Sequence, residues 1–202
     1  MLSAPRSVTR LIREFSKLPG IGAKTSERFV YFLLKHNREN IDQLTLALNE
    51  LQRSVRQCDQ CFSYSEKSTC DTCSDPTRDT SMLCVVAEPK DVFVFEHTGE
   101  FDGLYHVLGG VIDHVAGVGP QDLRLRELEE RIKNLNIAEV ILATNPDAEG
   151  ELTAIYIAQQ LEHLNVRMTR IARGLPTGAD IQFADDLTLT NALKSRRDFK
   201  RP

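Results

Sequence analysis

Apolar side chains in the first quarter of the chain recur at the three- and four-residue intervals of an amphipathic helix. One such series spans residues 8–15, a second spans 29–34, and a third spans 41–51. The glycine- and proline-containing segment 18–22 separates the first series from the second. Residues 1–54 are therefore predicted to form a small helical domain.

The pattern changes in the remaining part of the chain, where short, continuous apolar runs replace the helical spacing. Runs at residues 83–87, 92–95 and 140–143 are bounded by polar residues, which is typical of strands in a sheet covered on both faces. Stretches 121–135 and 152–164 have helical patterns. This alternation predicts an α/β domain with a largely parallel sheet.

Charge is distributed unevenly along the chain, although the net charge is only −4. Residues 1–57 have a balance of +5, and residues 58–202 have a balance of −9. Phosphate contact would therefore be concentrated near the N-terminus; chance clustering of surface charge is the alternative. No apolar run reaches the roughly 18–20 residues that span a bilayer, and no signal-peptide pattern is present, so we expect a cytoplasmic protein.

A tight turn between the first two predicted helices is the first functional motif. Gly20 and Gly22 bracket Ile21, so the backbone can turn sharply with few side chains over the turn. Backbone amides at the start of the next helix form a phosphate-binding site. Lys24 and Arg28 are four residues apart, so they project from one helix face beside this site. The segment resembles the helix-hairpin-helix family, whose hairpins bind the DNA backbone. We therefore predict DNA contact by Lys24 and Arg28; the alternative is a plain helical hairpin.

Four of the five cysteines lie within sixteen residues. Cys58 and Cys61 form one Cys-x-x-Cys pair, and Cys70 and Cys73 form a second. Two such pairs separated by a short loop can surround one ion, which predicts a closed, structural Zn²⁺ site. A redox pair and an iron–sulfur cluster are the alternatives. Cys84 lies in an apolar run and is predicted to be a core residue.

The segment 143–151, sequence ATNPDAEGE, follows the predicted strand 140–142. It resembles the acidic motif of the Toprim fold, which topoisomerases, bacterial primases and some nucleases share. In that fold the carboxylates converge with a glutamate after an earlier strand to hold Mg²⁺, and Glu88 occupies the corresponding position here. Clustered carboxylates suit magnesium because it is a hard ion that prefers oxygen ligands.

This copy of the motif departs from the catalytic pattern. Asn145 stands where the first aspartate of an Asp-x-Asp pair is expected, and an amide supplies no negative charge. No clear nucleophilic tyrosine is present either. Catalysis is therefore not expected, while weak Mg²⁺ or nucleotide contact stays an alternative. The remaining acidic residues are Glu88, Asp147, Glu149 and Glu151.

A helix-hairpin-helix, a four-cysteine site and a Toprim segment, in that order, together resemble the RecR family of recombination mediators. The resemblance covers nearly the whole chain and includes a loop at 105–110 and the segments 174–180 and 184–193. It divides the chain into a DNA-contacting domain (1–54), a zinc finger (55–77), a Toprim domain (78–174) and a C-terminal oligomerisation segment (175–202).

The resemblance implies a DNA-binding scaffold that has no catalytic activity of its own. Such proteins form dimers or tetrameric rings, act with RecO- and RecF-type proteins, and promote loading of RecA onto single-stranded DNA. The RecO-type partner is expected to dock on the acidic Toprim face, because the carboxylates of this face would attract a basic surface. The face consists of Glu88, Asp147, Glu149 and Glu151. Two alternatives are a Mg²⁺-dependent Toprim nuclease or phosphotransferase and a ribosome- or RNA-associated zinc protein.

Overall fold

The computed structural model describes residues 4–35 and 38–198. The chain divides into two compact units, residues 1–55 and residues 56–202, which we describe separately. None of the helices among the described residues is long and apolar enough to cross a lipid bilayer.

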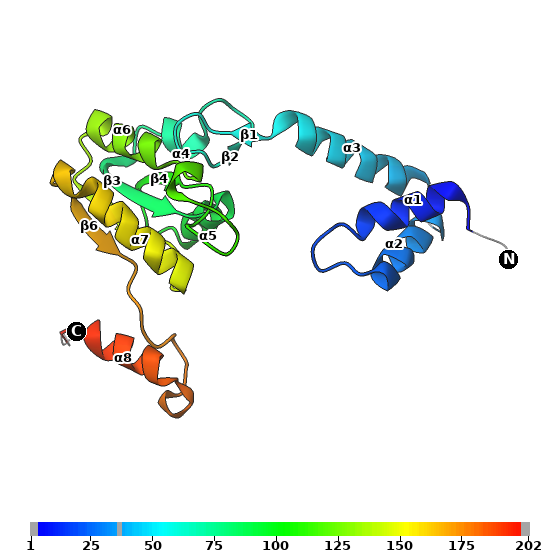
Figure 1. Ribbon diagram of the computed structural model, residues 1–202. Helices are drawn as coiled ribbons and strands as arrows, with labels where there is room; N and C mark the ends of the chain where they lie inside the picture. The colour runs from blue at the N-terminus through cyan, green and yellow to red at the C-terminus, as the bar shows by residue number, and fades with distance from the viewer. Residues whose placement is uncertain (1–3, 36–37, 199–202) are drawn as a thin grey trace. The chain divides into compact units, whose positions relative to one another are not determined.

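The first unit consists of helices, as the apolar spacing predicts. They are α1 (Arg6–Phe15), α2 (Ala23–Lys35) and α3 (Arg38–Ser54) (Figure 1). Helices α1 and α2 pack through an edge-to-face contact between Phe15 and Phe29, whose ring centroids are 6.0 Å apart. The hydroxyl of Ser16 donates to that of Ser26 across the same interface at 2.8 Å.

The second unit begins with a small cysteine-containing module and continues into a four-stranded parallel sheet. The module contains the antiparallel pair β1 (Arg56–Gln57) and β2 (Tyr64–Ser65) and the short helix α4 (Asp71–Ser74). The sheet contains β3 (Asp79–Val86), β4 (Gly103–Val107), β5 (Glu139–Leu142) and β6 (Arg167–Arg170), in the order β4-β3-β5-β6. The chain leaves β3 toward β4 on one side and enters β5 on the other, so loops that follow β3 and β5 meet at a topological switch point.

Helices cover both faces of the sheet, as the buried apolar runs predict. They are α5 (Pro89–Thr98), α6 (Leu125–Leu135) and α7 (Ala148–Leu161) (Figure 1). Leu128 from α6 and Ile157 from α7 join Leu83 and Val140 of the sheet in one core. Val92 from α5 packs with Cys84 in a second core. Three short 3₁₀ helices (Pro120–Asp122, Glu162–Leu164, Ile181–Phe183) and α8 (Asp186–Lys194) complete the unit.

The strand prediction for residues 92–95 is wrong, because this run lies inside helix α5. Pro89 occupies the first helical turn, where its fixed backbone angle suits a helix start. The Asp91 carboxylate accepts from the Glu88 amide at 2.9 Å, and Gly99 ends the helix at a φ of +67°. These end signals outweigh the β-propensity of the run, of which Val92 is buried whereas Val94 is 67% exposed.

Two strands of the parallel sheet have no counterpart in the sequence prediction. Residues 105–107, which are expected in a loop, belong instead to the fully buried strand β4. Strand β6, Arg167–Arg170, is polar because it lies at the sheet edge, and only its middle residues are partly covered. The helix predicted over 152–164 begins earlier, at Ala148, and the one predicted over 121–135 begins as a 3₁₀ turn, with α6 starting at Leu125.

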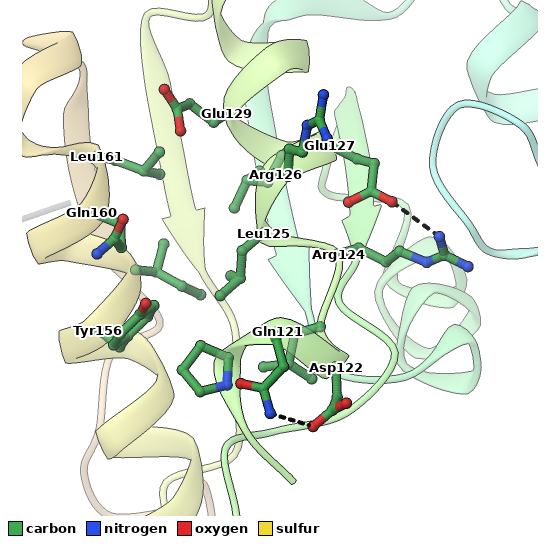
Figure 2. Close-up of a pocket in the computed structure, with 14 residues that line it drawn as sticks. Gln121, Asp122, Arg124, Leu125, Arg126, Glu127, Glu129, Tyr156, Gln160 and Leu161 are labelled. Carbon is green, nitrogen blue, oxygen red and sulfur yellow. Dashed lines mark hydrogen bonds and ion pairs between the residues drawn. The ribbon is translucent and has the colours of Figure 1, made fainter.

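A groove of about 670 Å³ lies between the start of α6 and one side of α7. Figure 2 shows Tyr156 and Gln160 of α7 facing Gln121 and Leu125 across it. Its polar side chains are partly paired with each other, as in the 2.9 Å ion pair between Arg124 and Glu127. No residue that the sequence singles out for chemistry lines this groove.

Candidate functional site

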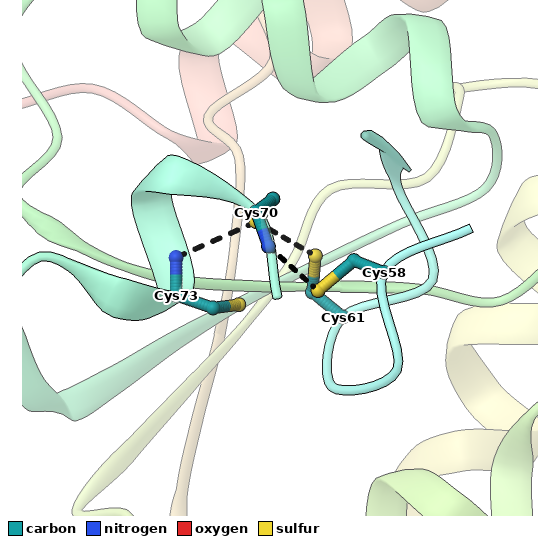
Figure 3. Close-up of side chains that lie close together, drawn as sticks. All are labelled: Cys58, Cys61, Cys70 and Cys73. Carbon is teal, nitrogen blue, oxygen red and sulfur yellow. Dashed lines mark hydrogen bonds between the residues drawn. The ribbon is translucent and has the colours of Figure 1, made fainter. Parts of the chain in front are cut away.

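The four clustered cysteines converge on one point, as their spacing predicts (Figure 3). Their Sγ atoms all lie within 4.8 Å of one another, and those of Cys61 and Cys70 are 3.5 Å apart. A tetrahedral zinc site with Zn–S bonds of about 2.3 Å requires S···S separations of roughly 3.8 Å. The four thiols therefore have the separation that a single tetrahedral ion needs, and none of them is joined in a disulfide.

Backbone amides already point at the sulfur atoms. Cys58 Sγ accepts from the amides of Gln60 at 3.4 Å and Cys70 at 3.3 Å, and Cys70 Sγ accepts from the amide of Cys73 at 3.4 Å. Hydrogen bonds from the thiols of Cys61 and Cys73 lower the pKa of Cys70, while the contact with Cys70 raises that of Cys61. Donors aimed at sulfur stabilise thiolates, and thiolates are the form that binds metal.

Arg131 of α6 joins the cysteine cluster to the sheet. It is only 9% exposed, and its guanidinium donates to Cys73 Sγ at 3.5 Å and also to the carbonyl oxygen of Tyr105 in β4. The neighbouring Val107 amide donates to the Cys61 carbonyl oxygen at 2.8 Å. Edge-strand groups that would otherwise lack partners are thus paired by the cysteine module and its buried arginine.

Phe62 forms a second link between the module and the sheet. It adopts a φ of +64° directly after Cys61, and its ring lies edge-on to that of His106 with centroids 5.4 Å apart. The guanidinium of Arg124 lies 4.8 Å from the centre of the Phe62 ring. Burial lowers the pKa of His106 to about 4, so this ring is a neutral packing element at physiological pH.

The acidic loop after β5 starts helix α7. Asp147 is the N-cap, and its Oδ1 accepts from the amide of Gly150 at 2.8 Å. The hydroxyl of Thr144 donates to the carbonyl oxygen of Gly150 at 2.9 Å, which fixes the approach of the loop. Asp147 therefore has a capping role as well as an exposed negative charge.

Glu151 is held by Arg170, the last residue of strand β6, and by Arg173, which follows the strand. Arg170 donates to both of its carboxylate oxygens, and Arg173 donates to Oε2 at 2.6 Å. Arg170 and then Arg173 lower the pKa of Glu151 to about 2. Of the predicted acidic residues, Glu151 is thus already neutralised within the chain, and Glu88 is paired with Lys90 at 2.7 Å.

No three of the acidic side chains that the structure describes lie close enough together to share one ion. Over residues 4–35 and 38–198, the four cysteines are the one group of three or more Cys, His, Asp or Glu whose ligand atoms are close enough to share an ion. Glu88 follows β3, and the acidic loop follows β5, so both lie at the carboxyl edge of adjacent strands.

The hairpin turn has the backbone that its glycines predict. Gly20 has a φ of +77°, which side chains other than glycine rarely adopt. Lys24 and Arg28 are both exposed on α2, and neither forms an ion pair with any described residue. The guanidinium of Arg28 lies 5.9 Å from the centre of the Phe29 ring. Ile21 is partly buried in the turn.

Comparison with known families matches three parts of the chain. Residues 8–51 match the family described as RecR, helix-hairpin-helix; residues 81–172 match the Toprim domain; and residues 174–197 match RecR, C-terminal. The Recombination protein RecR of Tropheryma whipplei (strain Twist) is 47% identical over 192 residues, which cover 95% of this chain and 97% of the relative. The chain belongs to the RecR family.

Other relatives agree over nearly the same length. The Recombination protein RecR of Rubrobacter xylanophilus is 46% identical over 198 residues, covering 98% of this chain and 100% of the relative. That of a Mycobacterium species (strain KMS) is 49% identical over 195 residues, covering 94% and 96%. The hairpin, the cysteine cluster and the Toprim sheet of this chain all lie within the length that these RecR relatives match.

Sequence reasoning missed the arginines that organise the two sites of this RecR-family chain. Arg131 is 58 residues from Cys73, and Arg170 is 19 residues from Glu151. Arg131 lies in α6 among charged residues that form exposed i, i+4 pairs such as Arg126–Glu130. Nothing in the local pattern separates a buried arginine from those surface residues.

Proposed function

We propose that this RecR-family chain is a DNA-binding scaffold of recombinational repair that performs no phosphodiester chemistry. The observation that carries the proposal is the contrast between its two candidate sites. The hairpin presents two exposed, unpaired cations, Lys24 and Arg28, beside a glycine turn suited to phosphate. At the carboxyl edge of β3 and β5, no three described carboxylates are close enough to share an ion, and Glu151 is held by Arg170 and Arg173.

The cysteine cluster would hold one structural Zn²⁺. Four thiolates with no vacant position suit zinc as a closed site, and the separation of the sulfur atoms supports this assignment. The ion would supply stability to the module and, through Arg131 and the Val107 amide, to the edge of the Toprim sheet.

The carboxyl edge of β3 and β5, which carries Glu88 and Asp147, would serve as a docking surface for a basic partner. In this family that partner is expected to be a RecO-type protein. Together with RecF-type proteins, the chain would promote loading of RecA on single-stranded DNA in the cytoplasm. Assembly of several copies into a dimer or ring is part of the proposal. It is supported by exposed apolar side chains in α3, where Leu46 and Leu51 contact little within the chain, and by Leu187 in α8.

Replacing Lys24 and Arg28 by alanine should weaken DNA binding to a similar extent for all sequences. Each lost phosphate contact should lower the slope of log K against log salt by about 0.7 on single strands and about 0.9 on duplex. Fluorescence anisotropy with labelled gapped duplex at 50–200 mM salt measures both quantities. The matched control is Lys133→Ala with Arg126→Ala, which removes two exposed cations from α6.

The same titration with Mg²⁺, resolved on native and denaturing gels, tests the absence of catalysis. We expect retarded but intact DNA. Nicked or cleaved strands would show that the chain is a Toprim enzyme, and unchanged affinity of the Lys24/Arg28 variant would overturn the hairpin assignment.

Replacing Glu88 by glutamine and Asp147 by asparagine should impair docking of the RecO-type partner while DNA binding is unchanged. These isosteric changes remove charge but keep an acceptor at the N-cap of α7, so helix stability is largely preserved. Binding of the purified partner by calorimetry measures the loss, with Glu130→Gln on α6 as the control. Normal docking combined with lost DNA binding would reverse the assignment of the two surfaces.

A further inference from the structure

Helix α1 carries a stripe of positive charge that the hairpin motif does not include. Arg6, Arg10 and Arg13 are spaced by four and three residues, and Lys17 follows two residues after the helix ends at Phe15. At 3.6 residues per turn the three arginines fall within an arc of about 60° on one face of the helix. All four side chains are exposed. We name Arg6, Arg10 and Arg13 the α1 arginine stripe.

The three arginines of the stripe have no direct ion-pair partner among the described residues, although the charges of Arg10 and Arg13 contribute, after that of Lys17, to lowering the pKa of Glu14. The acidic residue of this helix, Glu14, is paired with Lys17 at 2.7 Å. Among the described residues, Arg6, Arg10 and Arg13 have no ion pair and no side-chain hydrogen bond. Unpaired like charges on successive turns repel one another and destabilise the helix. Binding of a polyanion would relieve this repulsion.

The opposite face of α1 is already occupied. Val8 is buried, and Phe15 contacts Phe29 of α2, about 180° around the helix from the arginines. An amphipathic helix that binds a lipid surface needs its apolar face free for insertion.

We propose that the α1 arginine stripe is a second contact surface for the DNA phosphate backbone. It spans about 10 Å from Arg6 to Arg13 at a rise of 1.5 Å per residue, which is long enough for several phosphates of a strand. Arginine forms bidentate hydrogen bonds with phosphate. The proposal rests on the proposed DNA-binding function and adds to it a contact that extends beyond the hairpin.

The test compares two variants in an otherwise intact protein. In the first, Arg6, Arg10 and Arg13 are replaced by glutamine, and in the second they are replaced by lysine, which keeps the charge. Both substitutions preserve helix propensity. The probe is a fluorescein-labelled homothymidine oligonucleotide titrated at 50–200 mM salt. In the control variant, Arg126, Lys133 and Arg167 are replaced by glutamine. This variant removes the same number of positive charges, three, from the second unit.

The glutamine variant should lower the salt slope by about 2 and weaken binding at 0.1 M salt on the order of 100-fold if all three arginines contact phosphate. One contact alone would give a slope change of about 0.7 and about a fivefold loss. The lysine variant should keep the slope of the unaltered protein, and the control variant should bind normally.

Each of four results would overturn the stripe. Unchanged affinity of the glutamine variant, with weakened binding by the Lys24/Arg28 variant, would remove the stripe and leave the proposed function intact. Weakened binding with an unchanged salt slope would show that the substitutions act on the fold rather than on phosphate. Loss of binding to phosphatidylserine vesicles, with DNA binding retained, would assign the stripe to a membrane surface. If neither variant altered DNA binding, the hairpin assignment would fail together with the stripe, whereas absence of DNA binding by the unaltered protein would overturn the proposed function itself.

Discussion

Replacing Cys58 by serine should abolish metal binding and lower the free energy of unfolding of the second unit by about 3 kcal/mol or more. The Cys58 thiol is fully buried and accepts from two backbone amides, so no other side chain can take its place as a ligand. Structural zinc contributes roughly 10–16 kcal/mol of apparent binding free energy in isolated modules. The expected loss is smaller here, because the Toprim core keeps its own apolar packing when the ion is absent.

The loss should extend beyond the module to strand β4. The amide of Val107 bonds to the carbonyl oxygen of Cys61, and Arg131 bonds to both Cys73 and Tyr105. Without the ion, the cysteine pairs are free to separate, and these contacts weaken. Hydrogen exchange at the amide of Val107 should therefore become faster, while exchange in β5, which lies in the interior of the sheet, changes less.

The measurements are metal content by mass spectrometry, denaturant unfolding, and hydrogen exchange. Cys84→Ala is the matched control, because Cys84 is buried in the core and lies outside the cluster, so this variant should keep one ion per chain. A Cys58→Ser protein that retains stoichiometric zinc and normal protection of β4 would contradict the four-cysteine site.

Replacing Gly150 by alanine should destabilise the second unit by about 2 kcal/mol, although alanine is the better helix former. A Cβ atom at this position would lie 2.2 Å from the carbonyl oxygen of Asn145 and 2.9 Å from Oδ1 of Asp147. The first contact is with backbone, so the loop must move. A clash this close with backbone belongs at the upper end of the roughly 1–3 kcal/mol that forced backbone shifts cost, which leaves about 2 kcal/mol after the roughly 1 kcal/mol gained from helix propensity.

The sign of the change distinguishes the two effects. Steric displacement predicts a lower denaturation midpoint, faster exchange in the first turn of α7 and weaker docking of a basic partner at the acidic loop. Gly174→Ala is the control, because its Cβ would meet Ala192 at an ordinary 3.5 Å. A Gly150→Ala protein with increased stability would show that the loop does not require glycine.

Features encoded within a few neighbouring residues could be predicted from the sequence. The two Cys-x-x-Cys pairs predicted a metal cluster because each pair needs only one tight turn to present both sulfur atoms. The turn at Gly20 predicted a helical hairpin, because glycine accepts the positive φ observed there. The motif after β5 predicted a Toprim domain, which the family comparison confirms over residues 81–172.

Features that depend on distant residues were decided by the tertiary structure alone. Residues 92–95 have the apolar composition of a strand, but the ends of α5 and one-sided packing through Val92 make them a helix. Arg131 became a partner of Cys73 because strand order places α6 beside the module at the β4 edge. The sequence shows which residues carry charge, but it does not show which of them are paired in the folded chain. Which carboxylates stay available, and which are neutralised as Glu151 is by Arg170, depends on the crossover that brings β6 beside β5.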